Sequence, residues 1–278
     1  SERKLNSDKE DVPFPGYDAL SEEMNEKPAS IILTITDSEG NHIRNVKKNA
    51  SNGSGRIAWN LRHKSYYPVR AGRAQSNWWW NPSGPYVTPG QYTANLYLEN
   101  NGSVEKLDGP VEFNVKPLRA GTLEGASHDE YNSFRERISS LYIEMSKYQD
   151  EFNMMENKVQ LLEKASMQLE EFSPELMKKI SDFKAKYNAF DSDTNGNNAR
   201  SEIGEWDKVT ISTRVQIAMQ GLSTSYGPTD LNKSNLEIAE KLFKKLATDV
   251  KMFKSELETL ENEVKELNPP HLSGTGIN

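Results

Sequence analysis

The spacing of hydrophobic residues changes once along the chain, near Lys116 and Pro117. Before this point, apolar residues alternate with polar ones in short runs separated by Gly, Pro and Asn, which is typical of β-strands. After it, apolar residues recur every three and four residues for about 140 residues, which is typical of amphipathic helices. The pattern predicts a multidomain β + α protein with a β module at the front and long helices behind it.

The front half predicts a small Ig-like β-sandwich over residues 29–117, preceded by an irregular arm or linker over residues 1–28. Short alternating segments separated by turn residues are the basis of this prediction. The expected strands cover residues 31–36, 43–46, 56–61, 91–98 and 111–115. Trp59 lies in the third of these strands, and we expect it to fill the core of the sandwich.

The back half predicts a long antiparallel helical bundle over residues 127–268. A linker at residues 118–126 leads into it, and a tail at residues 269–278 follows it. Two long helices of similar length are expected at its ends, with two shorter ones between them. If the shorter pair is one broken return helix, the bundle has three layers; if not, it has four.

Capping signals place the starts of these helices. Ser127 precedes a helix of about 45 residues, with Glu130 at the third helical position, and Ser173 precedes a second one. A third helix is expected from about Ser201 to Leu222, and a last long helix follows the break at residues 226–229. The Glu- and Lys-rich outer faces of these helices are interpreted as solvated surface.

Composition narrows the class of protein. Charged residues make up 27% of the 278 residues and hydrophobic ones 35%, which is a globular balance. The net charge of −7 argues against nucleic acid as a partner, and the short apolar runs predict no transmembrane segment. The absence of cysteine excludes disulfides and thiolate chemistry. Because the chain begins with Ser1 rather than Met, we expect it to be a piece of a longer protein.

Three segments carry a resemblance to a known family: residues 33–44 (LTITDSEGNHIR), 59–62 (WNLR) and 84–92 (GPYVTPGQY). Together they resemble the Ig-like domain of flagellar hook-capping proteins. They are most similar to the copy of this domain near the C-terminus of large exported bacterial proteins of the glycosyl-hydrolase type, which carry sortilin-like or sialidase-like (BNR, Asp-box) β-propellers. The segment 227–229 (GPT) before a long helix is similar to the helical tail of the same proteins. The resemblance implies an upstream propeller domain as partner, and export to the periplasm, the outer membrane surface or the extracellular space.

One segment matches a metal-binding pattern. Residues 191–202 (DSDTNGNNARSE) satisfy the calcium-loop spacing D-x-[DN]-x-[DN]-G-x5-E, with helices expected on both sides. Calcium prefers six to eight oxygen ligands around a sharp glycine turn. The expected ligands are Asp191, Asp193, Asn195, Asn197 through its carbonyl, and Glu202. The alternative is a polar loop between helices, because no second loop is present to pair with this one.

A long loop between residues 62 and 84 is unusually aromatic and basic. Aromatic faces and guanidinium groups are typical of surfaces that bind sugars or protein partners. The alternative is that the loop packs on the edge of the sandwich or on a neighbouring domain. The residues of this candidate surface are Tyr66, Tyr67, Arg70, Arg73, Trp78, Trp79 and Trp80.

No set of residues in the sequence forms a recognisable catalytic site. The four histidines are not spaced to share a metal, and no glycine-rich phosphate loop follows a strand. We therefore expect a non-catalytic structural or interaction region of a larger exported propeller protein, with calcium as the one candidate cofactor. The alternative is a carbohydrate-binding module that uses the loop with Trp78, Trp79 and Trp80 to bind glycan.

Overall fold

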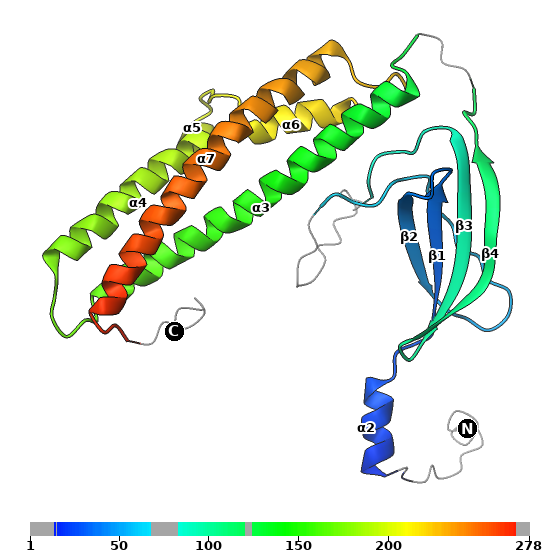
Figure 1. Ribbon diagram of the computed structural model, residues 1–278, viewed down its shortest axis with the longest axis horizontal. Coiled ribbons are helices and arrows are strands. Elements are labelled where there is room, and N and C mark those ends of the chain that lie inside the picture. The colour runs from blue at the N-terminus through cyan, green and yellow to red at the C-terminus, as the bar shows by residue number, and fades with distance from the viewer. Residues whose placement is uncertain (1–13, 15, 68–82, 120–123, 271–278) are drawn as a thin grey trace. The chain divides into compact units, whose positions relative to one another are not determined.

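The computed structural model describes residues 14, 16–67, 83–119 and 124–270 (Figure 1). The chain divides into two compact units. The sheet unit combines Ser1–Lys64 with Pro89–Pro117, and the helical unit combines Ser65–Thr88 with Leu118–Asn278. The last boundary lies beside the point where the hydrophobic period changes. The chain passes from one unit to the other three times, because Ser65–Thr88 leaves the sheet unit and the chain then returns to it.

The sheet unit contains a four-stranded antiparallel sheet in the order β2-β1-β3-β4. Its hairpins close through residues suited to tight turns. Asp37 Oδ1 accepts hydrogen bonds from the backbone N–H groups of Glu39 and Asn41 at 3.0 and 2.8 Å. Asn101 and Gly102 both have positive φ, as a two-residue hairpin turn requires. The strands are β1 (Ser30–Asp37), β2 (His42–Asn49), β3 (Gly90–Asn100) and β4 (Ser103–Val115).

One face of this sheet is apolar and carries an aromatic cluster. Directly opposed residues of neighbouring strands share a face, and here Ile35 lies opposite Ala94 and Tyr92 opposite Phe113. The ring of Trp59 packs on this face, with centroid distances of 5.5 Å to Tyr92 and 6.1 Å to Phe113. Trp59 is half-buried. It therefore covers part of the core of the sheet unit.

Residues 56–61 form no strand, so this part of the sequence prediction is wrong. The indole Nε1 of Trp59 donates to the carbonyl of Arg62 at 2.9 Å, and Leu61 has φ of 57°. This left-handed backbone closes a local turn, which an extended strand does not allow. The alternation of Ile57 with Trp59 reflects side chains that cover the sheet, since both are half-buried.

The N-terminal arm, predicted to be irregular, contains the helix α2 (Tyr17–Asn25). Its sequence has neither Gly nor Pro between Gly16 and Pro28, and Leu, Glu, Met and Ala favour helix. Tyr17 and Met24 on this helix are exposed.

The helical unit is built on two long helices and a broken line of shorter ones (Figure 1). The two predicted N-caps, Ser127 and Ser173, are confirmed, and Thr229 caps a third helix. The hydroxyls of Ser127, Ser173 and Thr229 each accept a hydrogen bond from a backbone N–H three residues ahead. The helices are α3 (His128–Ser166), α4 (Pro174–Asn195), α5 (Asn198–Glu202), α6 (Ile211–Gln220) and α7 (Asp230–Glu266).

The third predicted helix, expected from about Ser201 to Leu222, is wrong over its first half. Helix α5 ends at Glu202, residues 203–210 lie outside any helix, and α6 begins at Ile211. Gly204 has φ of 73°, which interrupts a right-handed helix, and Thr210 then caps α6. Trp206, an apolar position of the predicted helix, is consequently 96% exposed.

Two buried clusters form the core of the helical unit. In one, α4 packs on the C-terminal halves of α3 and α7, and in the other α6 packs on their N-terminal halves. Leu246 of α7 contacts both clusters. Helices α4 and α6 thus occupy successive stretches along the same two long helices, with residues 196–210 between them.

Side-chain pairs give the helix directions. Lys179 and Lys186 of α4 pair with Glu263 and Glu256 of α7, so these two helices are antiparallel. Tyr187 of α4 donates to the carbonyl of Phe152 of α3, and Met177, earlier in α4, accepts from Ser166, later in α3, so these two helices are also antiparallel. Because α3 and α7 are both antiparallel to α4, they run parallel to each other.

Candidate functional site

Helices α3 and α7 are joined by ion pairs with one constant spacing. Arg137 and Glu240 are 103 residues apart, and the same separation recurs in three further pairs. Along each helix, the pairs are seven or fourteen residues apart, which is a heptad repeat. We call this set the ion-pair ladder. It comprises Glu130–Lys233, Arg137–Glu240, Glu151–Lys254 and Lys158–Glu261.

The ladder defines the register of two parallel helices. The sign of the charge alternates along α3 from Glu130 to Arg137, and its partner on α7 alternates in the opposite sense. A shift by one heptad would place Arg137 against Lys233, or Glu130 against Glu240, and like charges repel. The ladder therefore disfavours these shifted registers, although each exposed pair contributes little to stability by itself.

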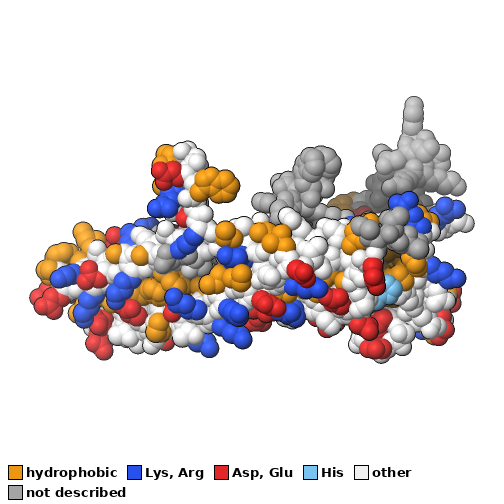
Figure 2. Space-filling view, turned by 90° about the horizontal axis from the view of Figure 1, so that it is seen from above, with side chains coloured by type: hydrophobic (Ala, Val, Ile, Leu, Met, Phe, Trp, Pro, Cys, Tyr) orange, Lys and Arg blue, Asp and Glu red, His pale blue; other side chains and the backbone are white. Residues whose placement is uncertain are grey.

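The sequence analysis missed this ladder because it interpreted the charged faces as solvated surface. The signal that could have found it is a pattern of opposite charges repeated at a fixed separation of 103 residues. On the face visible in Figure 2, basic and acidic side chains are interspersed with hydrophobic ones.

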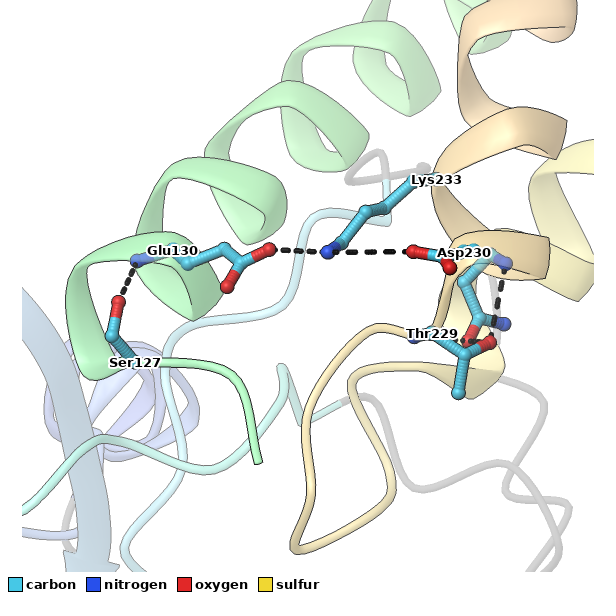
Figure 3. A network of polar contacts seen from close by, with 6 residues as sticks. Ser127, Glu130, Thr229, Asp230 and Lys233 are labelled. Carbon is cyan, nitrogen blue, oxygen red and sulfur yellow. Dashed lines mark hydrogen bonds and ion pairs between the residues drawn. The ribbon is translucent and has the colours of Figure 1, made fainter. Parts of the chain in front are cut away.

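The ladder begins at the end of the unit where α3 and α7 both start (Figure 3). Lys233 pairs with Glu130 of α3 and lies 4.0 Å from Asp230 of its own helix. The hydrogen bond to Glu130 raises the pKa of Lys233 above its ordinary value. Each helix start is capped by its own hydroxyl, Ser127 on α3 and Thr229 on α7. One lysine thus bridges the first turns of both long helices.

Two glycines let the backbones approach each other just before these helices. The N–H of Ala126 donates to the carbonyl of Tyr226 at 2.8 Å. A Cβ added at Gly125 would lie 2.7 Å from that carbonyl oxygen, and one at Gly227 would lie 2.8 Å from the Ala126 Cβ. Gly227 also has φ of 80°. Both positions therefore require glycine in this arrangement.

The described ends of the segment Ser65–Thr88, residues 65–67 and 83–88, contact α3. The rings of Tyr66 and Tyr67 lie 5.4 and 5.1 Å from that of Tyr142, both in edge-to-face geometry. Burial raises the pKa of Tyr67. Further along, the hydroxyl of Tyr131 donates to the carbonyls of Tyr86 and Leu222 at 3.3 and 3.1 Å. We call this set of contacts the tyrosine clasp.

The clasp involves part of the predicted aromatic surface. Tyr66 and Tyr67 contact Tyr142 of the helical unit. The remaining residues of that surface lie outside the described part of the chain, so their role stays a prediction. They are Arg70, Arg73, Trp78, Trp79 and Trp80.

The predicted calcium segment begins within α4. Helix α4 extends to Asn195, so Asp191, Asp193 and Asn195 lie in its last turns and not in an open loop. The Nδ2 of Asn195 donates to Asp191 Oδ1 at 2.6 Å. Gly196 follows with φ of 92°, and Glu202 ends α5.

The rest of this segment is held by a residue outside the calcium pattern. Asp207 accepts hydrogen bonds from the backbone N–H groups of Asn197 and Lys208, and these bonds lower its pKa. Among the side chains that the structure describes, no three acidic or histidine side chains form a group that could hold a metal. The side chain of Asp193 is not among those described, and calcium binding stays a prediction.

Comparisons with protein families, with curated proteins and with solved structures find no match to this chain. Over the described residues, no helix has the combination of length and apolarity that crossing a bilayer requires.

Proposed function

We propose that the chain is a non-catalytic structural and interaction region of a larger exported bacterial propeller protein. In this proposal the sheet unit is an Ig-like domain, and the helical unit is a long bundle of three layers, with α4 and α6 as its broken return helix. The resemblance of residues 33–44, 59–62 and 84–92 to such proteins supports the assignment. The upstream propeller would be its partner.

The ion-pair ladder is the observation that carries the structural role. It runs from Glu130 to Glu261, over most of the length of α3 and α7. A parallel pair with fixed register, covered by α4 and α6, resists sliding and bending, and is therefore suited to hold a neighbouring domain at a set distance. A structural region of this kind needs helices with defined lengths and surfaces. It needs no reactive side chains.

The tyrosine clasp supports the same role. Because Ser65–Thr88 belongs to the helical unit, the chain enters that unit twice and leaves it once. Such repeated crossing ties the two units together through the backbone.

The test is binding between this chain and the region encoded upstream of it in its gene. We expect the two separately purified pieces to associate with a dissociation constant in the micromolar range or below, measured by calorimetry. The control is a glycan array probed with the wild-type chain and with a variant in which Trp78, Trp79 and Trp80 are alanine. Association without glycan binding supports the proposal. Glycan binding that the triple variant loses, without association, would replace it with the carbohydrate-binding alternative.

A further inference from the structure

We propose that the helical unit contains a binding site for a small neutral ring compound, at the interruption of its return helix. The site is a cavity of about 220 Å³. It lies between the end of α4, the start of α6 and the two long helices, where Leu246 joins the two core clusters. We call it the junction cavity.

The junction cavity exists because the third layer is interrupted. Helix α4 ends at Asn195 and α6 begins at Ile211, and both residues line the cavity. Between them the chain turns away through α5, so no third helix covers this stretch of α3 and α7. The ladder is also interrupted here. The position that would pair with Glu144 is Ala247, and Glu144 instead pairs with Lys147 of its own helix.

The lining has no charge, and this selects the class of ligand. Charged residues are 27% of the chain, yet none of the thirteen lining residues is Asp, Glu, Lys, Arg or His. An adjoining cavity shares Phe190, Thr194, Ile211 and Leu246 with this one, but its lining also includes the charged residues Lys208, Lys245 and Asp249. An ion entering the junction cavity would lose its hydration without a partner of opposite charge, which disfavours charged ligands.

Four of the thirteen lining residues are aromatic. The rings of Phe152 and Phe190 lie 5.6 Å apart and border the cavity together with two tyrosines and Met145. Rings and a thioether offer favourable edge and face contacts to another ring. An enclosed apolar cavity of about 150 Å³ accommodates benzene. The junction cavity is partly open to solvent and partly polar, and by volume alone its 220 Å³ or so has room for two fused rings.

Three polar side chains of the lining have hydrogen-bond partners: Ser146 bonds another lining residue, whereas Gln149 and Asn195 bond Asn153 and Asp191, which lie outside the lining. The hydroxyl of Ser146 donates to the carbonyl of Tyr142 at 2.9 Å, and the Nδ2 of Asn195 donates to Asp191 at 2.6 Å. Ser146 keeps lone pairs that can accept one hydrogen bond from a ligand. A neutral fused ring with a single N–H or O–H donor matches these features best. Indole is the probe of this class.

The experiment measures indole binding to the full chain by calorimetry and by saturation-transfer NMR. We expect saturable binding with one site per chain and a dissociation constant below about 1 mM. Indole-3-acetate and tryptamine, which add a negative and a positive charge, should bind at least tenfold more weakly, because the lining cannot neutralise them.

Two variants fill the cavity from different helices. Ser146→Leu adds bulk from α3, and Ser212→Leu adds it from α6. Each should weaken indole binding at least tenfold. Ser140→Leu is the matched control, since Ser140 is exposed on α3 and does not line the cavity; it should bind indole as the wild type does.

The outcomes decide the proposal. Loss of binding in either folded filling variant, with retention in Ser140→Leu, supports it. If one filling variant fails to fold, as shown by circular dichroism, the other decides. Absence of saturable indole binding in the wild type overturns the proposal, and so does unchanged binding in the folded filling variants.

Discussion

Arg137 of α3 and Glu240 of α7 form a two-pronged ion pair between parallel helices. The Nε of Arg137 donates to one carboxylate oxygen at 3.1 Å, and its Nη2 donates to the other at 2.8 Å. The hydrogen bonds to Glu240 raise the pKa of Arg137. This planar geometry fixes direction as well as distance, which a lysine at the same position does not do. The pair is therefore the best-defined point of the ion-pair ladder.

Exchanging these two charges tests the ladder. Arg137→Glu alone places two carboxylates together and should reduce the free energy of unfolding by about 1 kcal/mol. The double variant Arg137→Glu with Glu240→Arg should recover most of that loss, because the pair is restored in reverse. Urea unfolding of the single and double variants gives the coupling energy. If the double variant loses as much free energy of unfolding as the two single variants lose together, the pair does not contribute to register.

The last pair of the ladder, Lys158–Glu261, should contribute more to the free energy of unfolding than the neighbouring pair, Glu151–Lys254. Glu261 is buried, with a side chain 8% exposed, and its Oε1 lies 2.6 Å from Lys158 Nζ. Lys158→Met removes this partner and should cost about 2 kcal/mol, since a buried carboxylate is left without compensation. Lys254→Met is the matched control on α7. Its partner Glu151 is 39% exposed and 3.8 Å away, so the loss should be within about 0.5 kcal/mol.

The starts of α3 and α4 were predictable because the signals for them are local. Ser127 and Ser173 each cap a helix through a bond to a residue three positions ahead, and Thr229 does the same for α7. The break at Gly204 was missed because one glycine can be tolerated within a helical pattern, and the apolar Ile203 and Trp206 continued that pattern.

Long-range features of the structure have no comparably local signal. The strand predicted at residues 56–61 shows this, because alternating apolar residues can cover a sheet as well as pair within one. The ladder links residues 103 positions apart, and only a comparison of two distant charge patterns could have found it. The junction cavity depends on where α4 ends and α6 begins, and helix ends are the least predictable part of an element.

Trp59 should stabilise the sheet unit measurably. Its ring contacts Tyr92 and Phe113, but it is only half-buried, so Trp59→Ala should cost about 2–3 kcal/mol, less than a fully buried tryptophan. Trp59→Phe keeps a ring and loses the hydrogen bond to Arg62, and should cost less. Thermal unfolding of both variants is the measurement. Equal losses would indicate that the hydrogen bond, not the ring packing, is the dominant contribution.

The lowered pKa of Asp207 predicts that the loop between α5 and α6 is sensitive to acid. Hydrogen bonds from the N–H groups of Asn197 and Lys208 lower its pKa, so its ionised form is favoured in the folded protein. The resulting stabilisation is present above the ordinary aspartate pKa of 3.8 and is lost as pH falls through the lowered value. The amide NMR signal of Asn197 should therefore shift with the ionisation of Asp207. In Asp207→Asn that shift in acid should disappear, and if it persists another group is responsible.

Calcium binding at residues 191–202 remains a prediction, and the structure sharpens it. A twelve-residue calcium loop needs its first five residues to curl around the ion, whereas here Asp191 and Asn195 lie in α4 and bond each other. Binding would have to unwind the end of α4. We therefore expect weak affinity, in the range of about 10⁻⁴–10⁻³ M that is typical of extracellular modules.

The melting temperature, measured with millimolar calcium and with chelator, distinguishes calcium binding from a polar segment that only connects helices. If calcium binds, the melting temperature should rise with its concentration, by an amount equivalent to about 2.7 kcal/mol at a hundredfold excess over the dissociation constant. Circular dichroism should also show a small loss of helix as the end of α4 unwinds. Glu202→Gln removes a two-oxygen ligand and should abolish both effects, whereas Glu205→Gln, just beyond the pattern, should preserve them. If the wild-type melting temperature is the same in calcium and chelator, residues 191–202 serve only as a polar connection from the end of α4 through α5.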